Sequence, residues 1–238
     1  MGLEPHSWAL SVKEAVALQQ TLAAQVRIEP LPTRLKIIGA ADISYSRQTD
    51  LLISVIVALR WPSLDLLDSV HYVCRATFPY MPGLLSFREV PPLIEAYRKI
   101  REKLDVLLCD GQGIAHPRKV GFASHLGLCL GIPTVGCAKS RLCGDHESLS
   151  LRKGSSKPLL LSGEQLGVVF CSRDGVKPIY ISPGHLSDIA SSERLVSRCL
   201  RGYRIPEPLR LAHLEANRRR AEVENWISEA GCWKFRDG

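Results

Sequence analysis

The strongest constraint on the fold of this chain is a change of pattern near residue 87. Before it, three segments rich in β-branched and apolar residues follow one another with polar breaks between them, at 35–44, 51–61 and 66–78. After it, two short apolar segments at 105–111 and 133–139 flank a helical segment from about 119 to 130. Strands that alternate with helices form parallel, right-handed units. We therefore expect an α/β fold, with a mixed sheet in which three antiparallel strands are followed by parallel strands, flanked by helices.

The remaining segments add helices and strands around this sheet. Residues 8–26 carry apolar side chains at helical spacing and predict an amphipathic helix. Another helix is expected after Phe87, with Pro91 and Pro92 in its first turn, where a missing N–H costs little. The Gly- and Ser-rich stretch 143–158 is interpreted as a surface excursion. Two strands and two helices complete the chain, at 166–172, 178–182, 187–200 and 206–221.

Length and charge limit what such a chain can do. Its 238 residues are within the range of one large domain, so we expect a single domain over residues 1–238. A net charge of +7 favours an anionic partner, although charge alone does not separate nucleic acid from acidic lipid. The longest apolar run, at 51–59, has the length of a strand, so no membrane insertion is expected. The N-terminal residues lack the pattern of a secretory signal, and we expect a monomer of the reducing cytoplasm.

The cysteines do not predict a disulfide framework. All eight are spread through apolar stretches without a C-x-x-C unit, and we interpret them as buried, reduced thiols. His125 and Cys129 stand one helical turn apart, a spacing at which two side chains can bind one metal ion. No second ligand pair with zinc-type spacing follows them, so a packed helix face is the preferred interpretation.

Three carboxylates are hard to explain as structural residues. Asp42 lies within an apolar strand, where an unpaired carboxylate is costly, so a cation or several donors should face it. Asp110 ends the segment 105–111, and ligands of α/β sheets bind at the carboxyl ends of parallel strands. A turn-forming Asp before Gly explains Asp110 equally well. Glu89 lies at the expected junction of loop and helix, where complementing the helix dipole is the structural alternative.

These three carboxylates would form a metal site if the predicted strands bring them together. Asp42 and Asp110 can lie on adjacent strands, with Glu89 entering from the flanking helix. Their charges would repel one another without divalent cations, and hard oxygen ligands suit Mg²⁺ or Mn²⁺. Phosphodiester hydrolysis with two metal ions uses such a cluster, because one ion activates a water and the other stabilises the leaving oxygen.

Longer motifs give the sequence a family resemblance. Besides Asp42, they are PYMPGLLSFRE at 79–89, DGQGIAHPRKVGFASHLG at 110–127 and VGCAKSRLCG at 135–144. In this order they resemble endonuclease V, specifically its bacterial form, from about Ile37 to Glu215. The resemblance implies a ribonuclease H-like fold. It also implies Mg²⁺-dependent hydrolysis, with Mn²⁺ as a substitute, of the second phosphodiester bond 3′ of a deaminated purine such as inosine. The products would be a 3′-hydroxyl and a 5′-phosphate.

The same resemblance assigns catalytic residues. It implies that Asp42, Glu89 and Asp110 bind metal, in agreement with the burial argument. Lys139 matches the catalytic lysine, whose ammonium offsets charge on the phosphate; a solvated lysine at a strand end is the alternative. His213 matches the family's fourth active-site position, where some eukaryotic relatives carry an acidic residue. Both metal ligation and the orientation of a water fit His213.

The resemblance further implies a strand-separating wedge and a base pocket. The wedge would consist of Pro79, Tyr80, Met81 and Pro82, with Met81 where the family commonly has Ile. Tyr80 would fill the gap left by an extruded base, whereas a proline-rich turn with Tyr80 in the core is the structural alternative. The pocket would lie between this loop and residues 111–121, where glycines allow close main-chain approach. Its residues would be Gly83, Leu85, Gly111, Gly113, His116 and Gly121.

The sequence thus predicts a nuclease that binds nucleic acid and initiates repair of deaminated purines, with DNA preferred and inosine-containing RNA as a further substrate. Arg88, Arg118, Lys119 and residues 218–220 are candidates for contacts to the phosphate backbone, and a solvated helix face explains the last run equally well. One alternative is a structure-selective nuclease of the same fold, such as a junction resolvase, which would not need the wedge. Another is a non-catalytic inosine-binding protein, which would have no use for a metal cluster.

Overall fold

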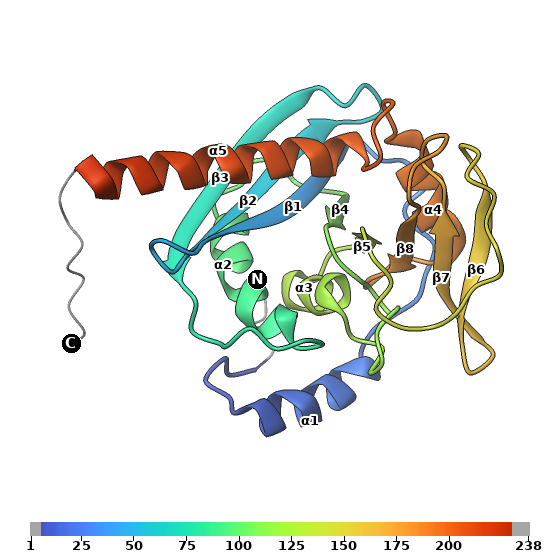
Figure 1. The fold of residues 1–238 in the computed structure, drawn as a ribbon, viewed down its shortest axis with the longest axis horizontal. Coiled ribbons are helices and arrows are strands. Elements are labelled where there is room, and N and C mark those ends of the chain that lie inside the picture. Colours follow the sequence, from blue (N-terminus) through green and yellow to red (C-terminus); the bar gives the residue numbers. More distant parts are fainter. Residues whose placement is uncertain (1–5, 230–238) are drawn as a thin grey trace.

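The computed structural model describes residues 6–229, which are built on one eight-stranded mixed sheet (Figure 1). The strands follow the order β3-β2-β1-β4-β5-β8-β7-β6 across the sheet. They are β1 (Ile37–Ser46), β2 (Leu51–Arg60), β3 (Leu66–Arg75), β4 (Val106–Cys109), β5 (Thr134–Ala138), β6 (Ser156–Leu161), β7 (Glu164–Phe170) and β8 (Ile179–Pro183). The helices are α1 (Val12–Ala23), α2 (Leu85–Tyr97), α3 (Phe122–Leu130), α4 (Ile189–Arg198) and α5 (Glu207–Glu229).

The pairing of the strands confirms the expected mixed sheet. β1, β2 and β3 form an antiparallel meander. β4 pairs parallel to β1, and β5 pairs parallel to β4, so the helices between these strands act as crossovers. The last three strands return antiparallel, with β8 beside β5 and β7 between β8 and β6.

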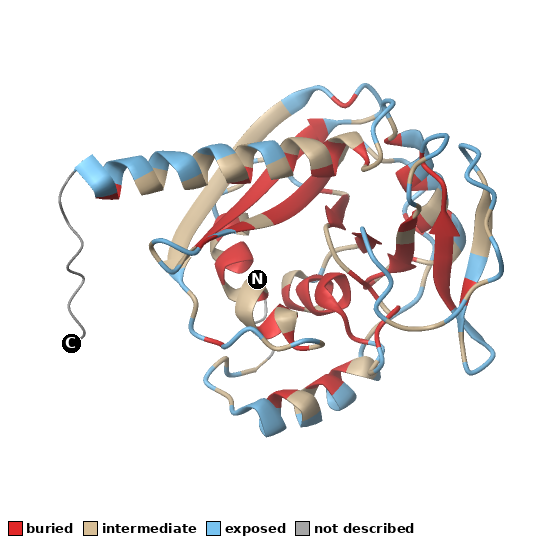
Figure 2. Ribbon diagram, viewed as in Figure 1, coloured by how far each residue is buried: buried red, intermediate tan, exposed pale blue. Residues whose placement is uncertain are grey.

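Helices cover both faces of the sheet and produce two separate hydrophobic layers. On one face, α4 and α5 pack on alternate residues of the central strands, such as Ala40, Val57 and Leu108. On the other face, α2 and α3 pack on the residues between them, such as Ala41 and Leu107. Buried residues therefore follow one another without alternation in β1, β2 and β4, as expected for strands covered on both sides (Figure 2).

Helix α1 lies outside these layers and packs against α2 rather than against the sheet (Figure 1). Its start is determined by a capping box, in which Ser11 accepts from the N–H of Glu14 and the Glu14 carboxylate accepts from the N–H of Ser11. The helix is therefore shorter than the predicted segment 8–26. The Phe87 side chain of α2 is fully buried in the cluster beneath α1.

The start of α2 differs from the prediction. The helix begins at Leu85, before Phe87, so that Pro91 and Pro92 lie in its middle and not in its first turn. Burial of Phe87 from within the helix favours the earlier start and offsets the hydrogen bonds that two prolines cannot make. Ser54 of β2 donates its hydroxyl to the carbonyl oxygen of Pro92 at 2.9 Å, which fixes this part of the helix on the sheet.

Two further differences concern the C-terminal half. The stretch 143–158, expected to be a surface excursion, runs into the edge strand β6, which begins at Ser156 with the polar residues Ser and Lys followed by Pro158. Helix α5 extends to Glu229, beyond the predicted end at 221. Within the described range no helix is both long enough and apolar enough to cross a bilayer.

The cysteines of the described range form no disulfides. Five of them are buried as predicted, but Cys74 and Cys143 are only partly covered. Cys232 lies outside the described residues.

Candidate active site

Two aspartates meet where β1 and β4 run side by side. The parallel register pairs Ala41 with Cys109, and the next residues along the two strands are Asp42 and Asp110. The N–H of Asp110 donates to the carbonyl oxygen of Ala41 at 3.4 Å, which holds the end of β4 against β1. Asp42 shares its side of the sheet with Ala40, the side that faces α5. It is only 7% exposed, so its carboxylate is almost removed from solvent.

Glu89 approaches these aspartates from α2. It lies inside the helix and not at its N-terminus, so complementing the helix dipole does not explain it. Burial, together with the nearby charges of Asp42 and Asp110, raises the pKa of Glu89 to about 8. Within residues 6–229, no group forms a hydrogen bond or an ion pair with its carboxylate. Glu89 is therefore a half-buried acid without a partner, beside two more acids.

A lysine and a histidine partly compensate the negative charge of this cluster. Lys139 follows β5 and forms an ion pair with the Asp110 carboxylate. His213 of α5 donates from Nδ1 to Oδ2 of Asp42 over 2.9 Å. Burial and the charge of Asp110 raise the pKa of Asp42, although His213 and Lys139 oppose this shift. Lys139 and His213 thus contact opposite members of the aspartate pair.

A chain of hydrogen bonds determines how His213 is oriented. The Ser44 hydroxyl donates to Oδ1 of Asn217 at 3.0 Å, and the Asn217 amide lies 3.0 Å from Nε2 of His213. An amide nitrogen only donates, so Nε2 of His213 accepts and Nδ1 carries the proton that is shared with Asp42. Ser44 and Asn217 could not be identified from the sequence, because their roles depend on how α5 packs across β1.

A cleft of about 470 Å³ opens above these residues. Asp42, Glu89, Asp110 and Lys139 all line it. Most of the predicted wedge and base pocket lines the same cleft: Tyr80, Met81, Pro82, Gly83, Leu85, Gly111, His116 and Gly121. Pro79, Gly113 and His213 do not contribute to the lining, so His213 acts on the cleft only through Asp42.

The loop before α2 is exposed at its tip and anchored at its base. Tyr80 is 71% exposed, which excludes the alternative of a core residue. At the base, the carbonyl oxygen of Gly83 accepts from Arg118, from Gln19 and from Nε2 of His116, at 2.9, 3.1 and 3.0 Å. Gly83 adopts a φ of +77°, which favours glycine at this position. The tip is thus free to meet a ligand while the base is fixed.

The glycines between residues 111 and 121 permit close packing of the main chain. A Cβ at Gly113 would lie 1.8 Å from the carbonyl oxygen of Pro183, and one at Gly121 would lie 2.4 Å from that of Gln112. Gly113 therefore holds the loop against β8 and does not face the cleft. Gln112, to which the sequence assigned no role, lines the cleft and donates to the carbonyl oxygen of Ser140 at 2.9 Å.

Several other lining residues could not be found from motifs. Gln19 reaches the cleft from α1 and bonds Arg118 and the carbonyl oxygen of Val120. The remaining ones are Ile43, Ser86, Phe122, Ala138, Ser140, Arg141 and Leu142. No sequence pattern singled them out, because their place depends on long-range packing.

The predicted backbone-contact residues are engaged within the protein. Lys119 forms an ion pair with Glu164, and Arg88 donates to the carbonyl oxygen of Phe78 at 2.9 Å. The arginines at 218–220 pair with acidic residues three or four positions away on α5. Exposed pairs of this kind are weak, so they leave these side chains available for a polyanion.

The arrangement defines a class of protein. Carboxylate oxygens gathered at the edge of a cleft could hold a hard divalent cation, and the unpartnered acid Glu89 is the group that gains most from one. A lysine stands beside them, and an open groove leads past an exposed aromatic side chain. A mixed α/β sheet with such an acidic cleft is typical of hydrolytic nucleases.

Comparison with known proteins identifies the family. The sequence profile of the endonuclease V family matches residues 20–214. Endonuclease V from Nostoc sp. is 42% identical over 217 residues, which cover 91% of this chain and 98% of that protein. The chain belongs to the endonuclease V family.

Solved structures agree with this assignment. Endonuclease V from Streptomyces avermitilis is 34% identical, with a TM-score of 0.87 and coverage of 92% of this chain and 97% of that one. A Ciona intestinalis endonuclease V, solved in complex with a 24mer DNA containing an inosine followed by a ribo-adenosine, is 25% identical. Its TM-score is 0.79, over 89% of this chain and 98% of that one.

Proposed function

We propose that this protein nicks DNA that contains inosine or another deaminated base, and that it cuts the second phosphodiester bond 3′ of that base. The observation that carries the proposal is the meeting of Asp42, Glu89 and Asp110 in one cleft with the loop around Tyr80. Family membership and the inosine-containing DNA bound by the Ciona relative support the same substrate. Inosine-containing RNA is a further substrate under this proposal.

The chemistry of the donor set fits Mg²⁺, with Mn²⁺ as a substitute. Asp42, Glu89 and Asp110 offer oxygen ligands, and their mutual repulsion is relieved by positive charge. Divalent ions held there would activate the attacking water and offset the charge that develops on the scissile phosphate. The role of Glu89 depends on its charge, because a protonated carboxyl is a poor ligand.

Lys139 and His213 act from the two sides of the aspartate pair. The ammonium of Lys139 is held at the cleft by Asp110, where it can contact a phosphate oxygen of the bound strand. His213 orients Asp42 by donating from Nδ1, and Asn217 keeps it in this tautomer. A role for His213 as a ligand would require its release from Asn217, so we assign it the orientation of Asp42.

Tyr80 and the base of its loop select the substrate. Inserting an exposed aromatic ring between bases replaces part of the stacking that is lost when a nucleotide is extruded. The extruded base would enter the cleft beside Gly83, Gly111 and His116. His116 is buried, and burial lowers its pKa to about 4, so its imidazole is neutral at physiological pH.

We further propose that the chain works as a single domain and as a monomer. One continuous sheet supplies Asp42, Asp110 and Lys139, and helices on its two faces supply Glu89 and His213. All five residues come from one chain, which supports a site that needs no second copy.

A cleavage assay tests the proposed function. End-labelled duplexes with and without a single inosine are incubated with Mg²⁺ or with chelator, and the product ends are mapped. We expect a nick only in the inosine strand, only with Mg²⁺, and at the second bond 3′ of inosine. Cleavage of branched duplexes in preference to the inosine duplex, or cleavage in chelator, would overturn the proposal. Asp65→Asn, in an exposed turn, is the matched control and should cut at the wild-type rate.

A further inference from the structure

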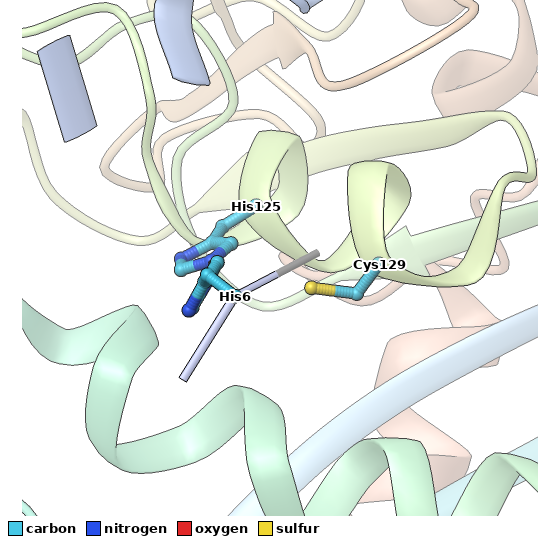
Figure 3. Close-up of side chains that lie close together, drawn as sticks. All are labelled: His6, His125 and Cys129. Atoms are coloured by element: carbon cyan, nitrogen blue, oxygen red, sulfur yellow. The ribbon is translucent and has the colours of Figure 1, made fainter. Parts of the chain in front are cut away.

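Two histidines and a cysteine form a compact cluster outside the cleft. His6, from the segment before α1, lies against His125 and Cys129 of α3 (Figure 3). One ligating atom from each side chain lies within 4.8 Å of the other two. None of the three lines the cleft. The sequence spacing indicated only the pair on α3, because His6 is 119 positions away from His125.

The hydrogen bonds of the two histidines direct their free nitrogens toward each other. Nδ1 of His6 lies 2.7 Å from the carbonyl oxygen of Ser7, which only accepts, so this nitrogen carries a proton. Neutral His6 therefore has its lone pair on Nε2, which lies 2.7 Å from Nε2 of His125. Nδ1 of His125 lies 2.9 Å from the Ser86 hydroxyl, which can accept its proton. In that tautomer two lone pairs face each other, and either a proton or a metal ion must lie between them.

The surroundings keep the imidazole of His125 neutral and fixed. Its side chain is fully buried, and burial lowers its pKa to about 3. Trp8 stacks on its ring with centroids 5.3 Å apart, and Phe87 contacts it edge-on at 5.0 Å. A neutral, oriented imidazole whose other nitrogen is hydrogen-bonded is the form in which histidine binds metals. Cys129 is buried beside it and adds a sulfur donor.

We propose that His6, His125 and Cys129 form a second metal site, for Zn²⁺ or a similar borderline-soft divalent ion. Two imidazole nitrogens and a thiolate are typical zinc ligands, whereas Mg²⁺ prefers oxygen. Tetrahedral zinc bonds of about 2.0–2.1 Å separate two nitrogen ligands by roughly 3.3 Å. The imidazole nitrogens must therefore move apart by about half an ångström, and His6, on a partly exposed segment, can provide this movement. Water would complete the coordination.

The site would connect three parts of the chain. His6 belongs to the N-terminal segment, His125 and Cys129 belong to α3, and Ser86 belongs to the first turn of α2. Ser86 also lines the cleft, and Glu89 follows three residues later. Metal binding would stabilise the wall of the cleft without contacting the reacting groups, so its effect should be on stability.

Cobalt spectroscopy on the full-length chain tests this site independently of nuclease activity. After chelator treatment, Co²⁺ should produce a thiolate-to-cobalt charge-transfer band and the visible bands of tetrahedral Co²⁺, and Zn²⁺ should abolish both. The carboxylate cleft gives no thiolate band. Cys129→Ser should remove that band, whereas Cys74→Ser, at a partly covered cysteine on β3, should retain it. An absent band, or an equal band in Cys129→Ser, would overturn the proposal.

A thermal measurement keeps the test decisive if Cys129→Ser does not fold. His6 is only partly buried, so His6→Ala should fold and should lose most of the Zn²⁺-induced rise in Tm. Mg²⁺ should not replace Zn²⁺ in this effect. An equal Zn²⁺-induced rise in wild type and His6→Ala contradicts the site.

Discussion

Replacing Glu89 by Gln should reveal how strongly the metal-free cleft opposes a third negative charge. The folded protein holds the pKa of Glu89 at about 8, against an ordinary value of 4.5. Because this pKa is raised by folding, the folded state binds the proton more tightly than the unfolded state. The resulting stability is fully present below pH 4.5 and is lost as the pH rises toward 8. Without divalent metal, wild type should therefore become less stable over this interval, whereas Glu89→Gln should not.

The size of the effect follows from the two pKa values. Each unit by which folding raises the pKa changes the free energy of unfolding by about 1.4 kcal/mol once the group is ionised. The rise from 4.5 to about 8 therefore corresponds to about 4–5 kcal/mol. Because Glu89 lines the cleft, solvent and small movements of the chain reduce the cost of ionising it. We therefore expect a loss of stability of about 2 kcal/mol. For a chain of this length that is about 4–8 °C in Tm.

The assay is thermal unfolding in chelator between pH 5 and pH 8.5, followed by the same series in Mg²⁺. In chelator, the difference between the Tm of Glu89→Gln and the Tm of wild type should rise with pH, so that the variant is the more stable protein at pH 8.5. Mg²⁺ should stabilise wild type alone and so make wild type the more stable protein at pH 8.5. Glu95→Gln is the matched control, because Glu95 lies on the same helix but pairs with Arg98 in solvent. Parallel pH profiles for wild type and Glu89→Gln would refute the reasoning.

Three further predictions concern the proposed roles of individual residues. Asp42→Asn and Asp110→Asn should each reduce nicking by at least about a thousandfold while an inosine strand still binds in a gel-shift assay, and full cleavage would remove both residues from the site. Tyr80→Ala should reduce the ratio of inosine to undamaged cleavage by about tenfold with an unchanged Tm, because the ring is exposed; an unchanged ratio would contradict the wedge. His213→Ala should reduce single-turnover cleavage by about ten- to a hundredfold in a titration of Mg²⁺ and Mn²⁺, because Asp42 loses the donor that orients it. Wild-type rates for His213→Ala at every metal concentration would make His213 a bystander.

The central part of the sheet could be predicted because its pattern depends on local sequence. Apolar segments of strand length separated by one helix predict the parallel pairing of β4 with β5. β4 also pairs parallel to β1, and this pairing brings Asp110 beside Asp42. The edge strand β6 could not be predicted, since its first residues, Ser156, Lys157 and Pro158, continue a Gly- and Ser-rich stretch that resembles a loop. The predicted start of α2 was wrong, because the burial of Phe87 beneath α1 depends on tertiary packing and not on local sequence.

The site was predictable only where a motif marked it. Buried charge in an apolar strand indicated Asp42, and the resemblance to the family indicated Lys139 and His213. Asn217 and Gln19 belong to no recognised motif, and each bonds a residue distant in sequence, Ser44 and Gly83 respectively. His6 is the extreme case, because its contact with His125 follows from how the segment before α1 returns to α3.

Helix α5, which lies across β1 and β2, is the last element of the described chain, yet it holds the partner of an aspartate on the first strand (Figure 1). Synthesis proceeds from the N-terminus, and the sheet residues Asp42 and Asp110 leave the ribosome long before His213. A growing chain therefore lacks the residue that Asp42 binds until α5 has been synthesised, after all eight strands of the sheet. The order of elements along the chain thus separates in time the synthesis of the two aspartates from the synthesis of the histidine that orients Asp42.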